Sequence, residues 1–107
     1  MAANTEDTLM IHKNEIVFYD QVEDKHYRLN PDNIVKITFD YAELKKFFGL
    51  RKEIVEFIKF DIKDDYIPEV LILREDYEPN FRRFLGGLRS WAEDNKLEIE
   101  VNRFERS

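Results

Sequence analysis

Residues 81–92 have the sequence FRRFLGGLRSWA, which is the clearest structural signal in this chain of 107 residues. The large apolar side chains of this stretch, with Ala92, fall at positions i, i+3, i+4, i+7, i+10 and i+11, so they share one face of an α-helix. Pro79 suits a first helical turn, and Asp94-Asn95 can end the helix. We therefore predict an amphipathic helix over about 80–94, with Trp91 as its main anchor in a core.

Two glycines interrupt this helical pattern. Gly86 and Gly87 should each cost about 1 kcal/mol relative to alanine in a helix interior. Gly87 lies at the edge of the apolar stripe, where close approach to a strand gives it a reason. Gly86 faces outward, and the sequence offers no packing reason for it.

The segments before the helix are rich in β-branched and aromatic residues, which favour strands. Asn30-Pro31-Asp32-Asn33 is the strongest turn signal among the polar breaks between them. The run Val70–Leu73 is apolar on both faces, which predicts that both faces are covered, and Pro68 should lie at a strand start or edge. We predict strands over 9–13, 15–22, 26–29, 34–39, 66–74 and, after the helix, 97–101.

Residues 40–62 fit two secondary structures. Asp40 and Glu43 form a helix-start pattern, and residues from Leu44 to Ile58 then recur at helical spacing, which would allow one long helix. Gly49 argues against it, because glycine is a natural end for a shorter helix. From residue 54 to 62, apolar residues recur at even spacing, which is typical of a strand. We favour a short helix or structured loop over 41–48 and a strand over about 53–62.

Composition indicates one packed domain over 9–107 that follows a flexible N-terminus, 1–8. Hydrophobic residues make up 43% of the chain and aromatic residues 14%, enough to form a core without covalent cross-links. The absence of cysteine excludes disulfides, thiolate metal sites and cysteine nucleophiles. No export signal or long apolar run is present, so we expect a cytoplasmic protein with no transmembrane segment.

The chain has a formal net charge of −6. Nucleic-acid binding draws most of its affinity from neutralising phosphates, so we expect no nucleic-acid partner. The same charge disfavours simple adhesion to anionic membranes.

No pattern of catalytic residues is present. His12 and His26 have no triad spacing around them. The carboxylates of Asp61, Asp64 and Asp65 lack the spacing and the glycine of a calcium loop, and a second group, Glu75 to Glu78, precedes the helix, where acids favour the backbone dipole. We expect no catalytic residue, metal or cofactor, and hence no enzyme.

Four cations bracket the apolar stretch Phe47-Phe48-Gly49-Leu50. A loop with cations around exposed aromatic rings could contact a phosphorylated head group or an acidic partner. The sequence favours the plainer interpretation that Phe47 and Phe48 lie in the core and that the cations are ordinary surface residues, as it does for the helix arginines Arg82, Arg83 and Arg89. The candidate ligand-binding residues are Lys45, Lys46, Arg51 and Lys52.

The order of elements resembles a pleckstrin-homology-like domain, particularly the small bacterial versions. The matching pieces are Glu15–Val22, Tyr27–Phe39, the hairpin Glu53–Arg74 and the helix Phe81–Ala92. The resemblance implies an α+β fold: a mostly antiparallel barrel or sandwich of about seven strands, capped by one C-terminal helix. The strand 97–101 is an addition to that plan, and the first hairpin lacks the basic residues of phosphoinositide-binding members.

Three functions stay open from the sequence. The first is a non-catalytic binding or assembly module, with a protein partner or self-association through extended segments such as Leu97–Val101. The second is a phospholipid head-group or small-ligand binder that uses the loop 44–52. The third is a small enzyme with Asp61, Asp64, Asp65 or His26 in a cleft.

Overall fold

The computed structural model describes residues 9–20 and 22–102, so the predicted flexible segment 1–8 lies outside the described residues. Seven strands and one helix follow one another along this part of the chain. They are β1 (Leu9–Ile11), β2 (Ile16–Asp20), β3 (Lys25–Leu29), β4 (Ile34–Lys46), β5 (Arg51–Ile62), β6 (Val70–Arg74), α1 (Phe81–Asp94) and β7 (Ile99–Val101).

The strands form two sheets, which confirms the α+β class. One sheet has the order β1-β2-β3 and the other has the order β6-β5-β4-β7. All neighbours are antiparallel except β7, which runs parallel to β4. Across the described residues the strands close no barrel. The strand predicted after the helix exists and adds to the edge of its own sheet.

One core holds the two sheets and the helix together. Phe18 of β2 meets Phe60 of β5 edge to face, with ring centroids 6.1 Å apart. From the helix, the indole N–H of Trp91 donates to the carbonyl of Lys13 at 3.3 Å, beside β1. The pattern read from 81–92 is confirmed, because its apolar face is buried among the core residues Phe81, Phe84, Leu88, Trp91 and Ala92.

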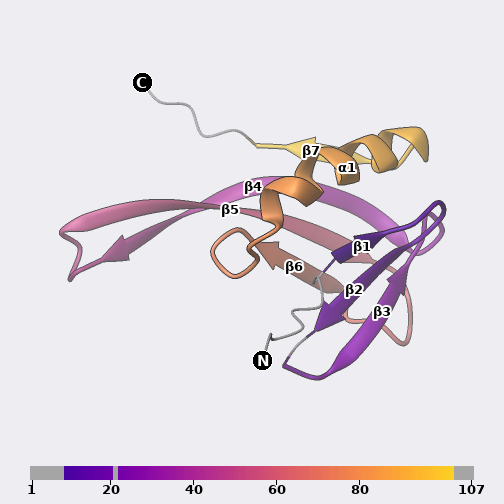
Figure 1. Cartoon of the computed structure of the whole chain (residues 1–107), viewed down its shortest axis with the longest axis horizontal. Coiled ribbons are helices and arrows are strands. Elements are labelled where there is room, and N and C mark those ends of the chain that lie inside the picture. Colours follow the sequence, from indigo (N-terminus) through magenta and orange to yellow (C-terminus); the bar gives the residue numbers. More distant parts are fainter. Residues whose placement is uncertain (1–8, 21, 103–107) are drawn as a thin grey trace, which may run out of the picture.

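The expectation of a helix or loop over 41–48 is wrong. β4 continues through Lys46, turns at 47–50, and returns as β5, so residues 34–62 form one long hairpin. Figure 1 shows this hairpin extending well past α1 and the other strands. Residues 41–46 are extended because they pair with β5, where Ala42 lies opposite Val55 and Leu44 lies opposite Glu53. The spacing of apolar residues along the sequence does not reveal this cross-strand pairing. The strand predicted over 53–62 is confirmed.

Two strands differ in detail from the sequence-based expectation. A register shift between Ile34 and Lys36 lets Ile34 share the core with Ile37, although simple alternation puts them on opposite faces. In β6, Val70 and Ile72 are 43% and 49% exposed, so the prediction that both faces are covered is wrong. β6 begins only after Pro68 and forms an edge of its sheet.

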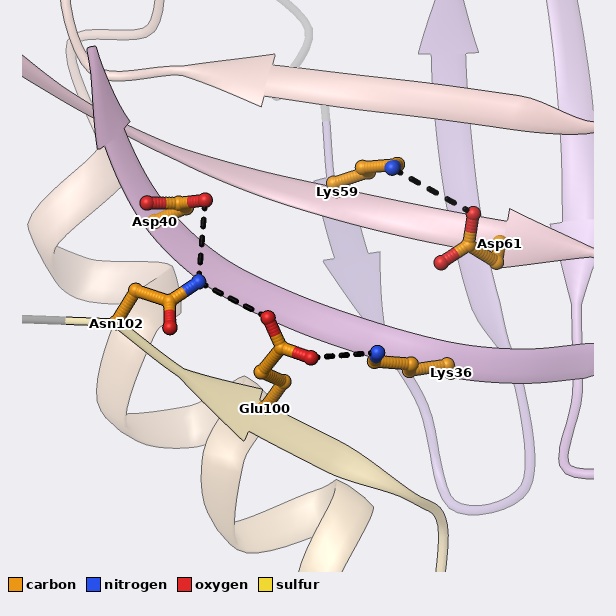
Figure 2. A network of polar contacts seen from close by, with 6 residues as sticks. All are labelled: Lys36, Asp40, Lys59, Asp61, Glu100 and Asn102. Carbon is orange, nitrogen blue, oxygen red and sulfur yellow. Dashed lines mark hydrogen bonds and ion pairs between the residues drawn. The ribbon is translucent and has the colours of Figure 1, made fainter.

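The face of the four-stranded sheet that points away from the core carries polar contacts around β7. Lys36 Nζ lies 2.6 Å from Glu100 Oε1, and the Asn102 side-chain amide donates to Glu100 at 3.0 Å and to Asp40 at 3.2 Å (Figure 2). The hydrogen bond from Lys36 lowers the pKa of Glu100, and the same bond raises the pKa of Lys36. These contacts hold the short β7 against β4.

Candidate functional site

The outer part of the β4–β5 hairpin, which we call the arm, comprises residues 41–56. β7 pairs with β4 only as far as Phe39, and β6 pairs with β5 only from Phe57 onward. Six residue pairs, from Tyr41–Glu56 to Lys46–Arg51, therefore belong to a two-stranded ribbon about 20 Å long. A two-stranded ribbon on its own is marginally stable in water, so the arm is the part of the fold with the least support.

The turn at the end of the arm has an unfavourable backbone. Phe47, Phe48 and Gly49 have φ angles of 56°, 58° and 87°, and the Leu50 N–H donates to the Phe47 carbonyl at 3.1 Å. Positive φ is natural for glycine, but for an L-residue it costs about 1–2 kcal/mol. Turns of this geometry prefer Asn-Gly or Asp-Gly. Two consecutive phenylalanines are thus a poor choice for the turn itself.

The side chains of this tip face the solvent. Phe47 and Leu50 are 63% and 88% exposed, and Phe48 is fully exposed. The prediction that both phenylalanines lie in the core is therefore wrong. Three large apolar side chains lie together on one exposed turn and contribute little to packing within the described part of the chain, and exposed apolar clusters of this kind mark contact surfaces.

The structure brings all four predicted site residues to the tip. Lys45, Lys46, Arg51 and Lys52 occupy the last two residue pairs of the arm, where Lys45 lies opposite Lys52 and Lys46 lies opposite Arg51. Like charges directly opposite in a sheet are destabilising.

Carboxylates on the arm compensate two of these cations. Lys46 pairs with Glu53, and Lys52 pairs with Glu43 at 3.5 Å. Within residues 9–20 and 22–102, no ion pair satisfies Lys45 or Arg51. The tip therefore combines uncompensated positive charge with exposed apolar surface.

A groove lies between the base of the arm and α1. Its volume is about 660 Å³. Asp40 and Tyr41 of β4 and Val101 at the end of β7 line one side, and Leu85 and Gly86 of α1 line the other. Arg82 bridges the two sides, because its guanidinium lies 2.6 Å from carboxylate oxygens of both Glu56 and Glu75.

The outward-facing glycine of the helix opens onto this groove. A Cβ atom built on Gly86 has nothing within 4 Å, so no close contact in the fold requires glycine there. Gly87 lies beside β1, but a Cβ atom built there would make only an ordinary van der Waals contact, 3.6 Å from Ile11 Cδ1, so this contact does not require glycine either. Glycine at position 86 leaves the groove wider but lowers the stability of the helix. The sequence pattern places Gly86 on the outer face of the helix and does not show this groove.

The carboxylates considered for chemistry have structural partners. Asp64 accepts hydrogen bonds from the Tyr66 backbone at 2.9 Å and from the Asn33 amide at 3.3 Å. Asp61 lies 3.9 Å from Lys59, at the end of the same strand. Among the described residues, no three histidine, cysteine or acidic side chains lie close enough together to hold a metal.

Asp76 and His26 also have partners within the fold. The Arg74 guanidinium donates two hydrogen bonds to the Asp76 carboxylate. This hydrogen bonding lowers the pKa of Asp76. The ring of His26 stacks on Tyr19 with centroids 4.7 Å apart, on the three-stranded sheet and in another part of the fold from Asp61 and Asp64. The structure therefore places Asp61, Asp64 and Asp65 around one surface hollow, together with Lys63 and Glu69, and places His26 in another part of the fold.

Comparison with known proteins adds no relative. No protein-family model, no curated protein and no solved structure matches this chain. The resemblance to pleckstrin-homology-like domains stays a prediction. Within the described residues, no helix combines the length and apolar character needed to cross a bilayer.

Proposed function

We propose that this chain is a non-catalytic binding module whose contact element is the tip of the arm, residues 45–52. The observation that carries the proposal is the exposure of Phe47, Phe48 and Leu50 on a strained turn. Residues with strained backbone cluster at functional sites. Pleckstrin-homology-like domains, which the element order resembles, mostly act as binding or assembly modules, and this analogy of fold agrees with the proposal.

Site-specific photocross-linking tests this proposal, because it captures whichever molecule touches the tip. A photoreactive phenylalanine analogue is placed at position 48, and a matched control is placed at Tyr66, which is 92% exposed outside the arm. In cells that make the full chain, we expect a covalent adduct from position 48 that position 66 does not give. Mass analysis then identifies the adduct as a lipid, another protein or a second copy. Equal, background-level labelling from both positions would refute docking through the tip.

A second candidate function is docking of the tip on an anionic membrane surface. The segment 45–52 carries four cations and no carboxylate, although the whole chain has a net charge of −6. The arm holds this segment about 13 Å or more from the body, four residue pairs along the ribbon, beyond the screening length of roughly 8 Å at physiological salt. The acidic body would therefore repel the membrane only weakly.

Vesicle co-sedimentation tests this second function. Binding to vesicles with 30% phosphatidylserine, and not to pure phosphatidylcholine vesicles, is expected for the natural chain. The double variant Lys45→Glu/Arg51→Glu should lose that binding, since both side chains lie on the exposed tip. A natural chain that sediments equally little with both vesicle types would exclude the membrane as the partner surface.

A further inference from the structure

The arm has an open strand edge beside the groove. The Ile37 N–H donates to Glu98, and the Phe39 carbonyl accepts from the Asn102 N–H, so odd-numbered residues of β4 direct their backbone groups toward the β7 side. Backbone direction alternates along a strand. Glu43 and Lys45 therefore present their N–H and C=O groups at this edge, where the described part of the chain supplies no further strand.

We propose that the partner of the arm is a second copy of this chain, which pairs with it edge to edge about a two-fold axis at Leu44. This inference rests on the proposed docking role of the tip and names its partner. In that antiparallel register, Glu43 of one copy lies opposite Lys45 of the other, and the reverse pair forms by symmetry. Both residues have their backbone groups directed at the edge, so the two pairs close a ladder without distortion.

Charge complementarity selects this register. Glu43 and Lys45 of the two copies form two opposite-charge pairs, which stabilise an antiparallel ladder. A register centred on Glu43 would instead place two carboxylates face to face on the axis. The pairing also compensates the unfavourable contact between Lys45 and Lys52 within each arm, because a carboxylate from the second copy joins them.

The same register carries each tip to the groove of the other copy. Counting outward from Leu44, Lys46 lies opposite Ala42 of the second copy, so the turn at 47–50 follows beside its Tyr41 and Asp40. Both Asp40 and Tyr41 line the groove. The exposed aromatic rings and the open space beside Gly86 are then complementary parts of one interface. A membrane would cover the tip but would leave the groove and the strand edge unused.

Disulfide trapping tests the register. The chain has no cysteine, so a single Leu44→Cys variant carries one thiol. Across the axis, Cα atoms of a directly opposite non-hydrogen-bonded pair lie about 4.5 Å apart, within the roughly 4.4–6.8 Å that a disulfide spans. We expect near-complete covalent dimer on air oxidation.

The matched control is Glu53→Cys. Glu53 lies opposite Leu44 on β5, one strand further from the axis, which separates its two copies by about three strand spacings or 14 Å. This variant should stay unlinked under the same oxidation. A Leu44→Cys chain that stays monomeric, or one that links no faster than the control, would overturn the register.

Molar mass in solution tests the contacts. Light scattering across a concentration series should rise from 13.0 kDa to twice that mass for the natural chain. Lys45→Glu should raise the dimer dissociation constant about tenfold or more, and Glu43→Lys/Lys45→Glu should restore it to within about threefold. Gly86→Leu, which favours the helix, should keep the fold but fill the groove and give a monomer. A natural chain of 13.0 kDa at every concentration would refute self-pairing.

The two proposals can fail separately. A photo-adduct at position 48 with a lipid or another protein, in a chain that is monomeric at all concentrations, overturns the dimer and leaves the docking tip intact. The absence of any adduct at position 48 overturns both.

Discussion

Phe48 combines a fully exposed aromatic side chain with a left-handed backbone, and each of these properties alone is unfavourable in a surface turn. Stability within one copy would favour a different residue at this position. The proposed function accounts for phenylalanine at this position by a contact made outside the chain.

Phe48→Asn tests this explanation at the level of one residue. Asparagine tolerates positive φ and forms the preferred Asn-Gly turn with Gly49. We expect the free energy of unfolding to rise by about 1 kcal/mol, measured by urea denaturation at concentrations where the natural chain is a monomer. Phe48→Ala serves as the control, since it removes the ring but keeps a poor turn residue. A loss of stability in Phe48→Asn would show that the ring packs within the chain.

Trp91 is the opposite case, an aromatic residue whose role lies within the fold. It is 7% exposed, and its N–H bonds to the Lys13 carbonyl. Trp91→Ala should lower the free energy of unfolding by about 3–5 kcal/mol, and Trp91→Phe should cost less because most of the apolar contact stays. Chemical denaturation measures both, and a loss under about 1 kcal/mol for alanine would contradict the assigned anchor role.

At the level of elements, the sequence was most informative where one segment carries its own pattern. The helix needed only the spacing of Phe81, Phe84, Leu88 and Trp91 along one stretch. The strand β7 showed the alternation of a half-buried strand. Both elements follow local periodicity, so the helix and the presence of the strand were confirmed, although in β7 only Ile99 packs against the core and Val101 is 38% exposed.

The arm could not be predicted in the same way. Its extended conformation depends on pairing between residues far apart in the sequence, such as Glu43 with Ile54. Local spacing around Leu44 and Phe47 imitates a helix because neither face of the arm is fully buried. The basic residues of the tip were found from composition, but the groove beside Gly86 was not, since it needs α1 and β4 to be placed together.

The strand β7 is attached by contacts that depend on pH. The pKa of Glu100 is lowered by the hydrogen bond from Lys36, so this contact stabilises the fold above the ordinary glutamate pKa of about 4.3 and is lost as pH falls through the lower folded value. Lys36 has a raised pKa, so its contribution is lost only as pH rises through that folded value. Both groups favour the fold at neutral pH.

Glu100→Gln should therefore flatten the decline of stability in acid. Thermal melting between pH 2.5 and 6 measures the effect, with Glu69→Gln as the control, because Glu69 is exposed and has no ion-pair partner among the described residues. If Glu100→Gln and the natural chain lose melting temperature in parallel across this range, the contact does not contribute to the fold.

At the scale of the whole molecule, the proposed assembly changes which backbone amides are protected. In a single copy, the N–H groups of Ala42 and Leu44 face β5, whereas those of Glu43 and Lys45 face the open edge. Pairing of two copies gives the second set its hydrogen bonds. The arm should therefore gain protection in an alternating pattern as copies associate.

Amide hydrogen exchange followed by NMR resolves this pattern. At concentrations where the chain is a monomer, the backbone amides of Glu43 and Lys45 should exchange at rates near those of an unstructured chain. Their protection factors should rise at least tenfold as the dimer forms. The protection of the Ala42 and Leu44 amides should depend less on protein concentration. Protection of all four amides that is independent of concentration would show that the arm is already complete in one copy.

The left-handed turn at 47–49 has a consequence in terms of chirality. Its φ angles are those that D-amino acids adopt without strain, so a chain synthesised with D-phenylalanine at position 48 keeps the aromatic ring while removing the backbone penalty. In the natural chain, the L-configuration of Phe48 disfavours the positive φ of the turn, whereas the proposed contact needs its aromatic ring. Inverting the configuration at Phe48 would therefore separate the effect of the backbone on folding from the effect of the ring on binding.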